Sequence, residues 1–328
     1  MRKTQKGKHN IFKYGIIALL VVFLVTGLCL LQIWDEQRSK KPTDDVSDET
    51  LFYDGKEYTP NKDVETFLVL GLDKAEGQSK GDSYNNDKQA DFLMLFVFDN
   101  SKKELSAIHI NRDTMANVNV LGVAGDKIDT VQKQIALAHT YGNGKGVSCR
   151  NTADAVSDLL LGVRVNHYIS LSLDSVTIVN DMVGGVQVEV LEDFTGIDDT
   201  LVKGETVTLM GEQALHYVRT RYGLDDNTNS TRMKRQQQYI NALYKKLHDC
   251  IEKDDDFIVD MSLKLADYIE SDRSVTRLQE LAEKFDSYEF KGIKNIDGES
   301  KMGEKFIEFY PDADSIEGLV VDLFYKEK

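Results

Sequence analysis

Cysteine is scarce in this chain of 328 residues, which contains three. Cys29 lies inside a long apolar run, and this leaves Cys149 and Cys250 as the pair that a disulfide bond could join. The dense bridge framework of small secreted domains is therefore excluded. Whether Cys149 and Cys250 lie within bridging distance stays open, because sequence spacing does not set the distance between their Cα atoms.

Basic residues are few relative to acidic ones. The chain has 40 lysines and arginines against 55 aspartates and glutamates, which gives a formal net charge of −15. Nucleic-acid binding draws heavily on lysine and arginine side chains that neutralise phosphates. The charge therefore argues against a nucleic-acid partner and against a DNA-binding regulator.

Several common catalytic signatures are absent. The sequence contains no G-x-S-x-G or H-E-x-x-H pattern. Its glycine-containing stretch at 142–146 lacks the Walker pattern and is interpreted as a loop. The histidines show no metal-ligand spacing. The usual hydrolase signatures are thus missing.

A long apolar run is present near the N-terminus. Tyr14 to Trp34 carries no charge, and at ~1.5 Å per residue a helix of this length spans a hydrocarbon core of about 30 Å. A secretory signal peptide is the alternative. Its apolar core is usually roughly 7–15 residues long and ends at small residues, unlike Gln32–Asp35 here. We therefore predict a transmembrane helix over residues 14–34.

Charges on either side of this helix predict its orientation. The flank before it contains five basic residues and no acid, whereas Asp35 and Glu36 follow it directly. The basic flank is expected in the cytoplasm, so we predict a single-pass cell-membrane protein with an extracellular C-terminal domain. The expected parts are a cytoplasmic tail (1–13), the helix (14–34), a linker (35–63), a main domain (64–255) and a C-terminal extension packed on it (256–328).

Short apolar runs alternate with helical patterns after the linker. Asp91–Asp99 is continuously apolar between two acids, which predicts a central strand covered on both faces and paired in a hairpin with Leu105–Ile110. The predicted strands are 65–72, 91–99, 105–110, 167–173, 186–190 and 218–222. The predicted helices are 130–140, 151–161, 174–182, 211–217 and 231–253. This alternation predicts a layered α/β domain.

Two acids stand at the ends of neighbouring predicted strands. Asp73 follows the run ETFLVLGL, and Asp91 opens the run DFLMLFVFD. Carboxylates that converge at such an edge suit Mg²⁺, which binds one or two carboxylates together with waters and substrate phosphates. On spacing alone, ordinary solvated strand ends explain both acids better.

Arginines form two further candidate groups. Asn111-Arg112-Asp113-Thr114 follows the third apolar run, where Arg112 could offer its planar guanidinium to a phosphate or pair with an acid such as Asp113. Arg219 and Arg221 are expected on one face of a strand, because side chains alternate with a period of two.

The long helix predicted after them opens with further polar and basic residues. Arg232, Arg235 and Gln236 have the spacing of one helix flank, and Asn229 precedes them. A helix N-terminus and four arginines suit a pyrophosphate. The alternative is a solvated basic patch, which is the poorer explanation in so acidic a chain.

The order of these motifs resembles that of the LytR-CpsA-Psr family. The resemblance covers about residues 64–250 and rests on seven segments: GLD (71–73), AD (90–91), NRDT (111–114), IALAHTYGNG (135–144), MVGGVQVEV (182–190), MGEQALHYVRTRY (210–222) and RMKRQ (232–236). It implies that the main domain is a catalytic domain with a mixed central β-sheet between helical layers, and that a prenyl tail lies in an apolar channel against the sheet.

The resemblance also implies an activity. Members of this family are membrane-anchored phosphotransferases that move wall teichoic acid, capsule or a related glycopolymer from undecaprenyl pyrophosphate to peptidoglycan. It implies that Asp73 and Asp91 hold Mg²⁺ and that Arg112, Arg219, Arg221 and Gln236 bind the pyrophosphate. We add Asn229, Arg232 and Arg235 to the pyrophosphate group, and we count Asp113 with Arg112, Arg219 and Arg221 as candidate catalytic residues.

Three positions depart from the family pattern. Gln89 replaces a common arginine, Gln134 a common lysine, and Asn229 a common aspartate. The departures leave the general base unassigned. They also leave three alternatives open beside the transferase: a protein that binds polyprenyl phosphates without turnover, a pyrophosphatase and, against the charge and the predicted export, a transcriptional regulator.

Overall fold

The structure, a computed structural model, describes residues 50–74, 87–221, 223–224, 228–254, 256–274, 284 and 287–328. These residues belong to the unit Glu49–Lys328. In this part of the chain no helix combines the length and the apolar character needed to cross a membrane. The predicted transmembrane helix at 14–34, the cytoplasmic tail and the first part of the linker lie outside the described residues.

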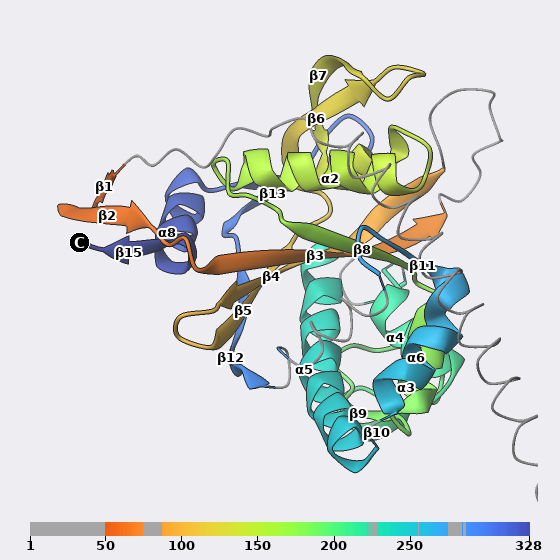
Figure 1. Cartoon of the computed structure of the whole chain (residues 1–328). Helices are drawn as coiled ribbons and strands as arrows, with labels where there is room; N and C mark the ends of the chain where they lie inside the picture. Colours follow the sequence, from red (N-terminus) through yellow and green to blue (C-terminus); the bar gives the residue numbers. More distant parts are fainter. Residues whose placement is uncertain are drawn as a thin grey trace, which may run out of the picture. The chain divides into compact units, whose positions relative to one another are not determined.

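A mixed β-sheet of six strands forms the centre of the described residues, in the order β11-β8-β3-β4-β5-β12 (Figure 1). Strands β3, β4 and β5 are antiparallel neighbours, whereas β8 runs parallel to β3 and β12 runs parallel to β5. The bounds are β3 Val64–Lys74, β4 Lys88–Asp99, β5 Glu104–Ile110, β8 His167–Ser172, β11 Ile269–Ser271 and β12 Glu289–Asn295. The predicted α/β fold with a mixed central sheet is confirmed.

Side chains of β3 alternate between two differently covered faces of the sheet. Leu68 and Leu72 point to one face, where they pack in an apolar cluster with residues of α2 (Gly146–Leu159) and α8 (Ala313–Phe324). Val69 and Gly71 point to the other face and line a cavity beneath α3 (Ser175–Met182) and α5 (Asn229–Lys253). Asp73 continues this second alternation. The acid at the end of β3 therefore lies on the face that α5 covers.

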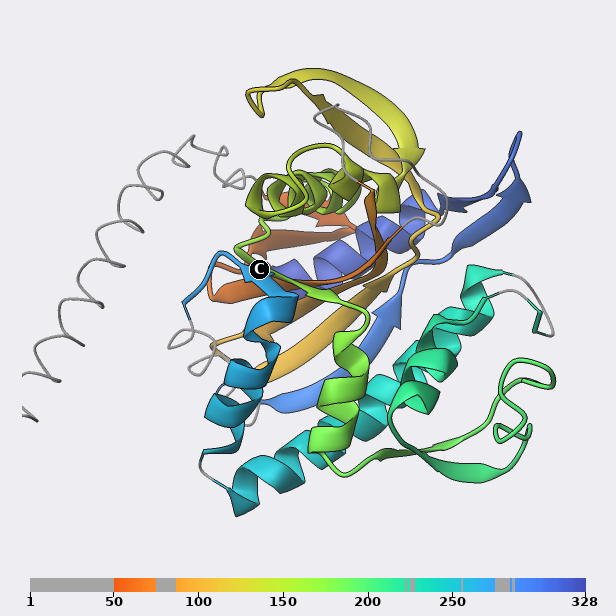
Figure 2. The same ribbon diagram turned by 90° about the vertical axis from the view of Figure 1, so that its right-hand side faces the viewer.

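Helices lie on both sides of the sheet, as Figures 1 and 2 show, with α2 on one side and α3 and α5 on the other. A second apolar cluster joins α3, α5, α4 (Glu212–Arg219) and α6 (Phe257–Leu265) to the hairpin of β9 (Val186–Glu189) and β10 (Thr206–Leu209). The remaining elements are β1 Leu51–Tyr53, β2 Lys56–Pro60, β6 Met115–Leu121, β7 Lys127–Gln134, η1 Ile135–Thr140, η2 Ala266–Tyr268, β13 Gly298–Met302, β14 Ile307–Pro311 and β15 Tyr325–Glu327.

The predicted helix over 130–140 is wrong for residues 130–134, whereas residues 135–140 are helical. Residues 127–134 form β7, which pairs with β6 in an antiparallel ribbon, and a 3₁₀ helix (η1) follows. Most side chains of β7 are exposed, so an apolar stripe at helical spacing would have nothing to pack against. The β-branched Ile128, Thr130 and Val131 instead favour a strand.

The predicted helix over 151–161 begins earlier than expected. Its first residue is Gly146, and Ser148 and Cys149 extend its buried face by more than a turn. Asn151, the first residue of the predicted range, donates hydrogen bonds to the carbonyl oxygens of Asn119 and Ala138. Cys149 and Cys250 are both free, so they do not form the disulfide that the sequence left open.

The C-terminal residues contribute strands to the central sheet. Both edge strands, β11 and β12, come from the segment 256–328 that was predicted to pack on the main domain. The strand β14 also touches the loop after β5, because the Phe309 amide donates to the Asp113 carbonyl oxygen at 2.8 Å. This segment is therefore part of the framework that holds the loop.

A buried histidine makes stability depend on pH. Burial lowers the pKa of His139 to about 4, whereas an unfolded histidine takes up a proton near pH 6.5. Between these values the unfolded state binds one proton more than the folded state. The free energy of unfolding therefore decreases by about 1.4 kcal/mol for each unit by which the pH drops below 6.5. His139→Gln should reduce the loss of stability between pH 7.5 and pH 5 by about 2 kcal/mol.

Urea unfolding at the two pH values measures this difference. The control is His248→Gln, because the side chain of His248 is 39% exposed. If the pH dependence of stability is unchanged in His139→Gln, the imidazole of His139 takes up its proton at the same pH in the folded and the unfolded state.

Candidate functional site

A cluster of charged side chains lies at one end of β3 and β4. It combines Asp73 from β3, Asp91 from β4, the loop that follows β5, the end of α4 and the first turns of α5. These elements are far apart in the sequence, and pairing of β3 with β4 and packing of α5 on the sheet bring them together.

An irregularity in the sheet places Asp91. Gly71 pairs with Phe92 and Leu72 pairs with Ala90, so Asp91 is an extra residue on β4 without a partner on β3. Such a β-bulge turns a side chain away from the regular alternation and is common near functional sites. The continuous apolar run on β4 gave no sign of this bulge.

Arg219 binds Asp73 with two hydrogen bonds. Its Nε donates to Oδ2 at 2.6 Å, and its Nη2 donates to Oδ1 at 2.8 Å. The expected strand over 218–222 is wrong, because Arg219 is the last residue of α4 and Thr220 follows as its C-cap. Buried Ala214, Tyr217 and Val218 have helical spacing and pack in the second apolar cluster, which continues the helix to this point.

Arg112 lies between three oxygen-bearing side chains. Its Nη2 donates to Gln89 Oε1 at 2.5 Å, and its Nε lies 3.1 Å from Asp91 Oδ1 and 3.9 Å from Asp113 Oδ1. The contact with Asp91 lacks hydrogen-bond geometry, since both Arg112 Nε and Asp91 Oδ1 are buried without a hydrogen-bond partner. A carboxylate oxygen at the centre of the cluster is therefore buried without a hydrogen-bond donor.

Asp113 is the most deeply buried acid of the cluster, with 1% of its side chain exposed. Its Oδ2 accepts from Arg221 Nη2 at 3.1 Å, and its Oδ1 accepts from Gln134 Nε2, also at 3.1 Å. Burial raises the pKa of Asp113, while Arg112 and Arg221 oppose this rise. Arg219 and Arg221 thus engage different acids and do not form the pair on one strand face that was predicted.

The first turn of α5 adds Asn229 and Arg232. Asn229 Oδ1 accepts from Arg232 Nε at 2.9 Å, and its Nδ2 donates to Asn111 Oδ1 at 2.7 Å. Asn111 Oδ1 also accepts from the amide of Asp113. Asn229 therefore links α5 to the loop after β5. Burial lowers the pKa of Arg232 to about 10, and Arg112 and Arg221 contribute in the same direction.

Arg235 lies apart from this cluster. Its Nε is 2.5 Å from Glu192 Oε2, and its other nitrogens donate to the carbonyl oxygens of Tyr217 and Thr220. Gln236 faces the cavity and donates to the Val218 carbonyl oxygen at 3.0 Å. The shared flank predicted for α5 therefore holds Arg232 and Gln236, whereas Arg235 secures the end of α4.

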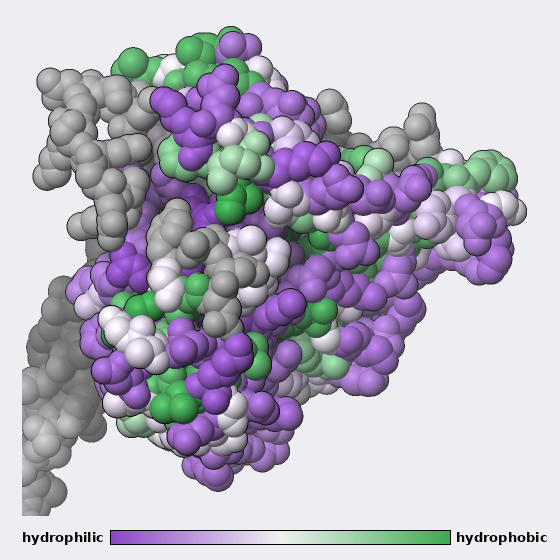
Figure 3. Space-filling model, turned by 180° about the vertical axis from the view of Figure 1, so that it is seen from behind, coloured by the Kyte–Doolittle hydropathy of each residue, from purple (hydrophilic) through white to green (hydrophobic). Residues whose placement is uncertain are grey.

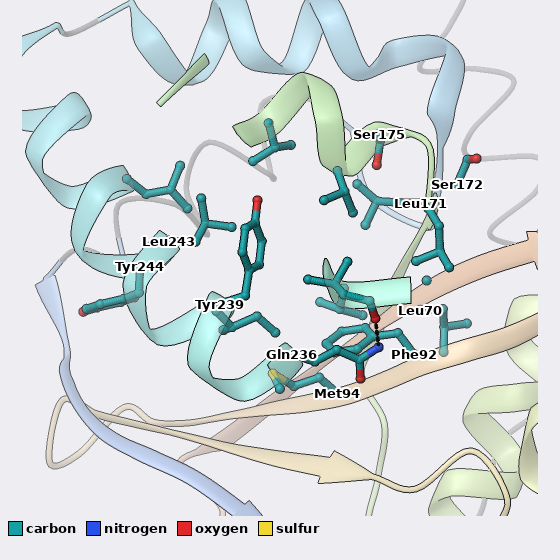
Figure 4. A pocket seen from close by; sticks show the side chains of 18 of the residues that line it. Leu70, Phe92, Met94, Leu171, Ser172, Ser175, Gln236, Tyr239, Leu243 and Tyr244 are labelled. Carbon is teal, nitrogen blue, oxygen red and sulfur yellow. Dashed lines mark hydrogen bonds between the residues drawn. The ribbon is translucent and has the colours of Figure 1, made fainter. Parts of the chain in front are cut away.

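Figure 4 shows an apolar cavity. Two of its lining residues, Gly71 and Val218, lie within two residues of Asp73 and Arg219 of the charged cluster. Gly71, Phe92 and Gln236 border it near the cluster, and Tyr244 and Leu247 border it further along α5. A Cβ on Gly71 would come within 2.8 Å of Phe92 Cβ, so glycine keeps the two strands and the cavity wall in place. The molecular surface is mainly hydrophilic on the face that Figure 3 shows, which sets this apolar lining apart.

The donor chemistry fits a magnesium ion shared with substrate phosphates. Mg²⁺ commonly binds one or two carboxylates and completes its shell with waters and phosphates. Asp91 Oδ1 accepts no hydrogen bond, but it is buried 3.1 Å from Arg112 Nε, so it fits such a role only when Arg112 turns away from it. Both oxygens of Asp73 accept from Arg219, so Asp73 fits only when that guanidinium turns to the phosphates. Across the described ranges, no group of three or more His, Cys, Asp or Glu residues could hold a metal by itself.

Three neutral side chains in the cluster stand at the positions that depart from the family pattern, and Asn229 was also predicted to bind the pyrophosphate. Gln89 binds Arg112, Gln134 binds Asp113, and Asn229 binds Arg232. Their role in orienting charged partners was missed, as was that of Asn111. Sequence spacing carries no signal for the contacts of Gln89 and Gln134, because each joins elements that are distant along the chain. Asn229 and Arg232 lie three residues apart on α5, a spacing that brings side chains together on a helix.

Paired arginines and carboxylates at the mouth of an apolar cavity define a domain suited to an amphipathic anion. The family model described as "LytR_cpsA_psr family" matches residues 31–318, and the chain therefore belongs to this family.

Relatives of this family are similar over most of the chain. A protein of Enterococcus faecalis named polyisoprenyl-teichoic acid–peptidoglycan teichoic acid transferase TagU is 28% identical over 247 residues, which are 74% of this chain and 72% of that protein. Its namesake from Bacillus licheniformis is 28% identical over 75% of this chain and 73% of its own length.

Two solved structures share the fold. "TagT bound to LIIa-WTA" has a TM-score of 0.60 at 19% identity and covers 86% of this chain and 95% of that chain. TagV of B. subtilis has a TM-score of 0.59 at 24% identity and covers 80% and 96% respectively.

The buried position of Arg235 predicts a role in stability. Arg235→Met leaves Glu192 as an unpaired charge with 5% of its side chain exposed, so the free energy of unfolding should fall by about 3–5 kcal/mol. Arg219→Met is the matched control, because its ion pair is 40% exposed on the arginine side and should contribute at most about 1 kcal/mol. Urea denaturation compares the two. Equal, small effects would contradict the structural role of Arg235.

Proposed function

We propose that this protein is a phosphotransferase that moves an anionic glycopolymer from an undecaprenyl-pyrophosphate carrier to peptidoglycan. The observation that supports this most directly is the meeting of the arginine cluster with the apolar cavity. A lipid pyrophosphate has these two parts, a diphosphate and a hydrocarbon tail, joined directly. The relatives named as teichoic acid transferases support a donor and an acceptor of this class.

The junction of the cluster and the cavity fits such a donor. Val218 and Gln236 line the cavity, and Arg219 follows Val218 directly. Gly71 lines the cavity two residues before Asp73. A tail in the cavity therefore places its diphosphate beside Arg219. The cavity lining is almost wholly apolar, so burying a prenyl chain there is favourable at about 25 cal/mol per Å² of apolar surface.

The arginines of the cluster take the pyrophosphate. Arg112, Arg219, Arg221 and Arg232 offer guanidinium groups that match phosphate oxygens in charge and in planar geometry. Asn229 orients Arg232, and Gln236 lies at the cavity mouth. Arg235 serves this site indirectly, by holding the end of α4 that carries Arg219. The buried carboxylate of Asp113 contacts Arg112 and Arg221 and holds both guanidinium groups in position.

Asp91, joined by Asp73, would hold Mg²⁺ in the proposed site. When bound, the ion would add positive charge next to the phosphates. Asp73 and Arg219 then form an exchangeable pair, in which the guanidinium leaves the carboxylate for the substrate. The Asp73–Arg219 pair is more exposed than the other described ion pairs of the cluster, with 40% of the arginine and 21% of the aspartate side chain accessible.

The reaction is an in-line displacement at the phosphorus next to the glycan. A peptidoglycan hydroxyl forms a new P–O bond there, the P–O bond to the lipid phosphate breaks, and the hydroxyl proton is released. The lipid monophosphate leaves with the bonding electrons. Arg112, Arg219 and Arg221 stabilise the negative charge that develops on the phosphate oxygens. The acceptor and the lipid place the domain outside the cell at the membrane, in agreement with the charges that flank residues 14–34.

Loss of Arg219 should abolish most of the transfer. Arg219→Ala removes a direct phosphate ligand, and we expect a fall in the transfer rate of roughly 10²-fold or more, as for other preorganised charge-stabilising groups. The matched control is Arg150→Ala. Arg150 lies on α2 and forms a comparably exposed ion pair with Asp272, in which 45% of the arginine side chain is accessible. The control should retain the wild-type rate.

A purified assay with lipid-pyrophosphate glycan, peptidoglycan acceptor and Mg²⁺ measures this transfer. Its products also separate the alternatives. Linked glycan identifies a transferase, lipid monophosphate without acceptor identifies a pyrophosphatase, and binding without product identifies a carrier-binding protein. Full transfer by Arg219→Ala would remove the assignment of the site.

Filling the cavity should weaken binding of the lipid tail without changing binding of the pyrophosphate. Val179 of α3 lines the cavity away from the charged cluster. Val179→Trp should lower the affinity for undecaprenyl phosphate at least tenfold, because the indole occupies the space of the tail, while inorganic pyrophosphate binds as in the wild type. Titration of both ligands measures the effect. Equal losses for both would indicate a general collapse of the site.

A further inference from the structure

We infer that the stacked rings of Tyr244 and Phe290 determine which lipid tails the cavity accepts. This inference rests on the proposed function, which places a polyprenyl tail in the apolar cavity. It adds a specificity-determining element at the end of the cavity opposite to the charged cluster, in a pair of residues that no motif of the family indicated.

The length of the cavity limits how much of a tail it can hold. Gln236 borders the cavity near the arginines, and Leu247 borders its other end, eleven residues further along α5. At ~1.5 Å per residue, the lined length is roughly 16 Å. A geranyl chain fits within this length. An extended undecaprenyl chain is far longer, so most of it has to leave the cavity at the end next to Tyr244 and Leu247.

Tyr244 forms a wall between two cavities. On one side it lines the apolar cavity, and Figure 4 shows it at the edge of that space. On the other side it lines a second, more polar cavity together with Phe290 and five other residues, Asn241, Lys245, His248, Tyr288 and Glu289. The rings of Tyr244 and Phe290 stack with centroids 5.1 Å apart and planes inclined by 29°. Displacing Tyr244 from Phe290 would join the two cavities.

The outer cavity is suited to a departing tail. Tyr288, Lys245 and His248 have apolar bodies and polar tips, and such side chains can border hydrocarbon while their polar atoms stay in water. Phe290 stands on β12 beside an irregularity in its pairing with β5, where the register shifts between Phe290 and Ile293. A long tail therefore leaves between α5 and β12, whereas a short tail ends before the stack and leaves it intact.

This arrangement predicts a penalty that depends on tail length. Separating a stacked aromatic pair weakens binding by roughly two- to tenfold. Long tails carry this penalty and short tails do not. Phe290→Ala removes the stack without altering the lining of the apolar cavity, because Phe290 borders only the outer one of the two cavities.

The test compares geranyl phosphate with undecaprenyl phosphate in one detergent, using the full-length protein. For each lipid, the affinity of the variant is divided by that of the wild type, so that partition of the lipid into micelles cancels. Phe290→Ala should raise this ratio for undecaprenyl phosphate by roughly two- to tenfold relative to geranyl phosphate. Phe290→Leu, which keeps an apolar side chain without a ring, should act in the same direction.

One control variant defines the expected pattern. Leu247→Ala removes an apolar contact inside the cavity. It should lower the affinity for undecaprenyl phosphate and should not raise that affinity relative to the affinity for geranyl phosphate. If Phe290→Ala and Phe290→Leu change both lipids by the same factor, the tail leaves elsewhere and the inference is overturned. If the wild type binds neither lipid, the proposed function itself fails.

Discussion

Burial of charge at one end of the central sheet constrains the architecture of this protein. Asp113 and Arg232 are almost inaccessible to water, and an isolated charge in such a position would cost several kcal/mol. Asp113 meets Arg221 and Gln134 from other elements, and Arg232 meets Asn229 on its own helix and Asp91 on β4. Satisfying these contacts at the same time fixes how α4, α5 and the loop after β5 sit on the sheet.

The same constraint explains why the C-terminal segment is integrated into the domain. Gln134 reaches Asp113 with one hydrogen bond and the Ile307 carbonyl oxygen with another, at 2.7 Å. The backbone of β14 adds a contact between Phe309 and Asp113. A strand more than 170 residues away in the sequence thus supports the loop that carries Arg112. The two edge strands of the central sheet come from this segment as well.

The site and the cavity are consequences of one sheet face. Along β3 the same alternation that points Val69 and Gly71 into the cavity brings Asp73 to its mouth. On β4 the bulge at Asp91 interrupts the alternation, so that Phe92 lines the cavity while Asp91 meets Arg112. An amphipathic ligand that lies along this face has its tail among apolar side chains and its anionic head among guanidinium groups. The proposed transferase activity follows from this division.

Much of the fold could be predicted from the sequence, and the reason is local. The apolar runs of β3, β4 and β5 are continuous or alternating, and the apolar stripe of α5 repeats at helical spacing, so hydrophobic burial alone specifies these elements. The ribbon of β6 and β7 could not be predicted in this way, because most of its β7 side chains are exposed and the pattern does not distinguish a helix from a strand. The end of α4 was predicted as part of a strand over 218–222. Two arginines separated by one residue are compatible both with a strand and with the end of a helix.

By itself, the sequence determined the acids at the strand ends, the arginine-rich segments and the family, since these depend on residue identity and order. The tertiary structure alone decided which arginine meets which acid: Arg219 meets Asp73, Arg221 meets Asp113, and Arg235 turns away to Glu192. It also decided that Gln89 and Gln134 orient charged partners from other elements. The physical reason is that these choices depend on contacts between elements distant in the chain, where burial requires each charge to be matched, and no local pattern records that requirement.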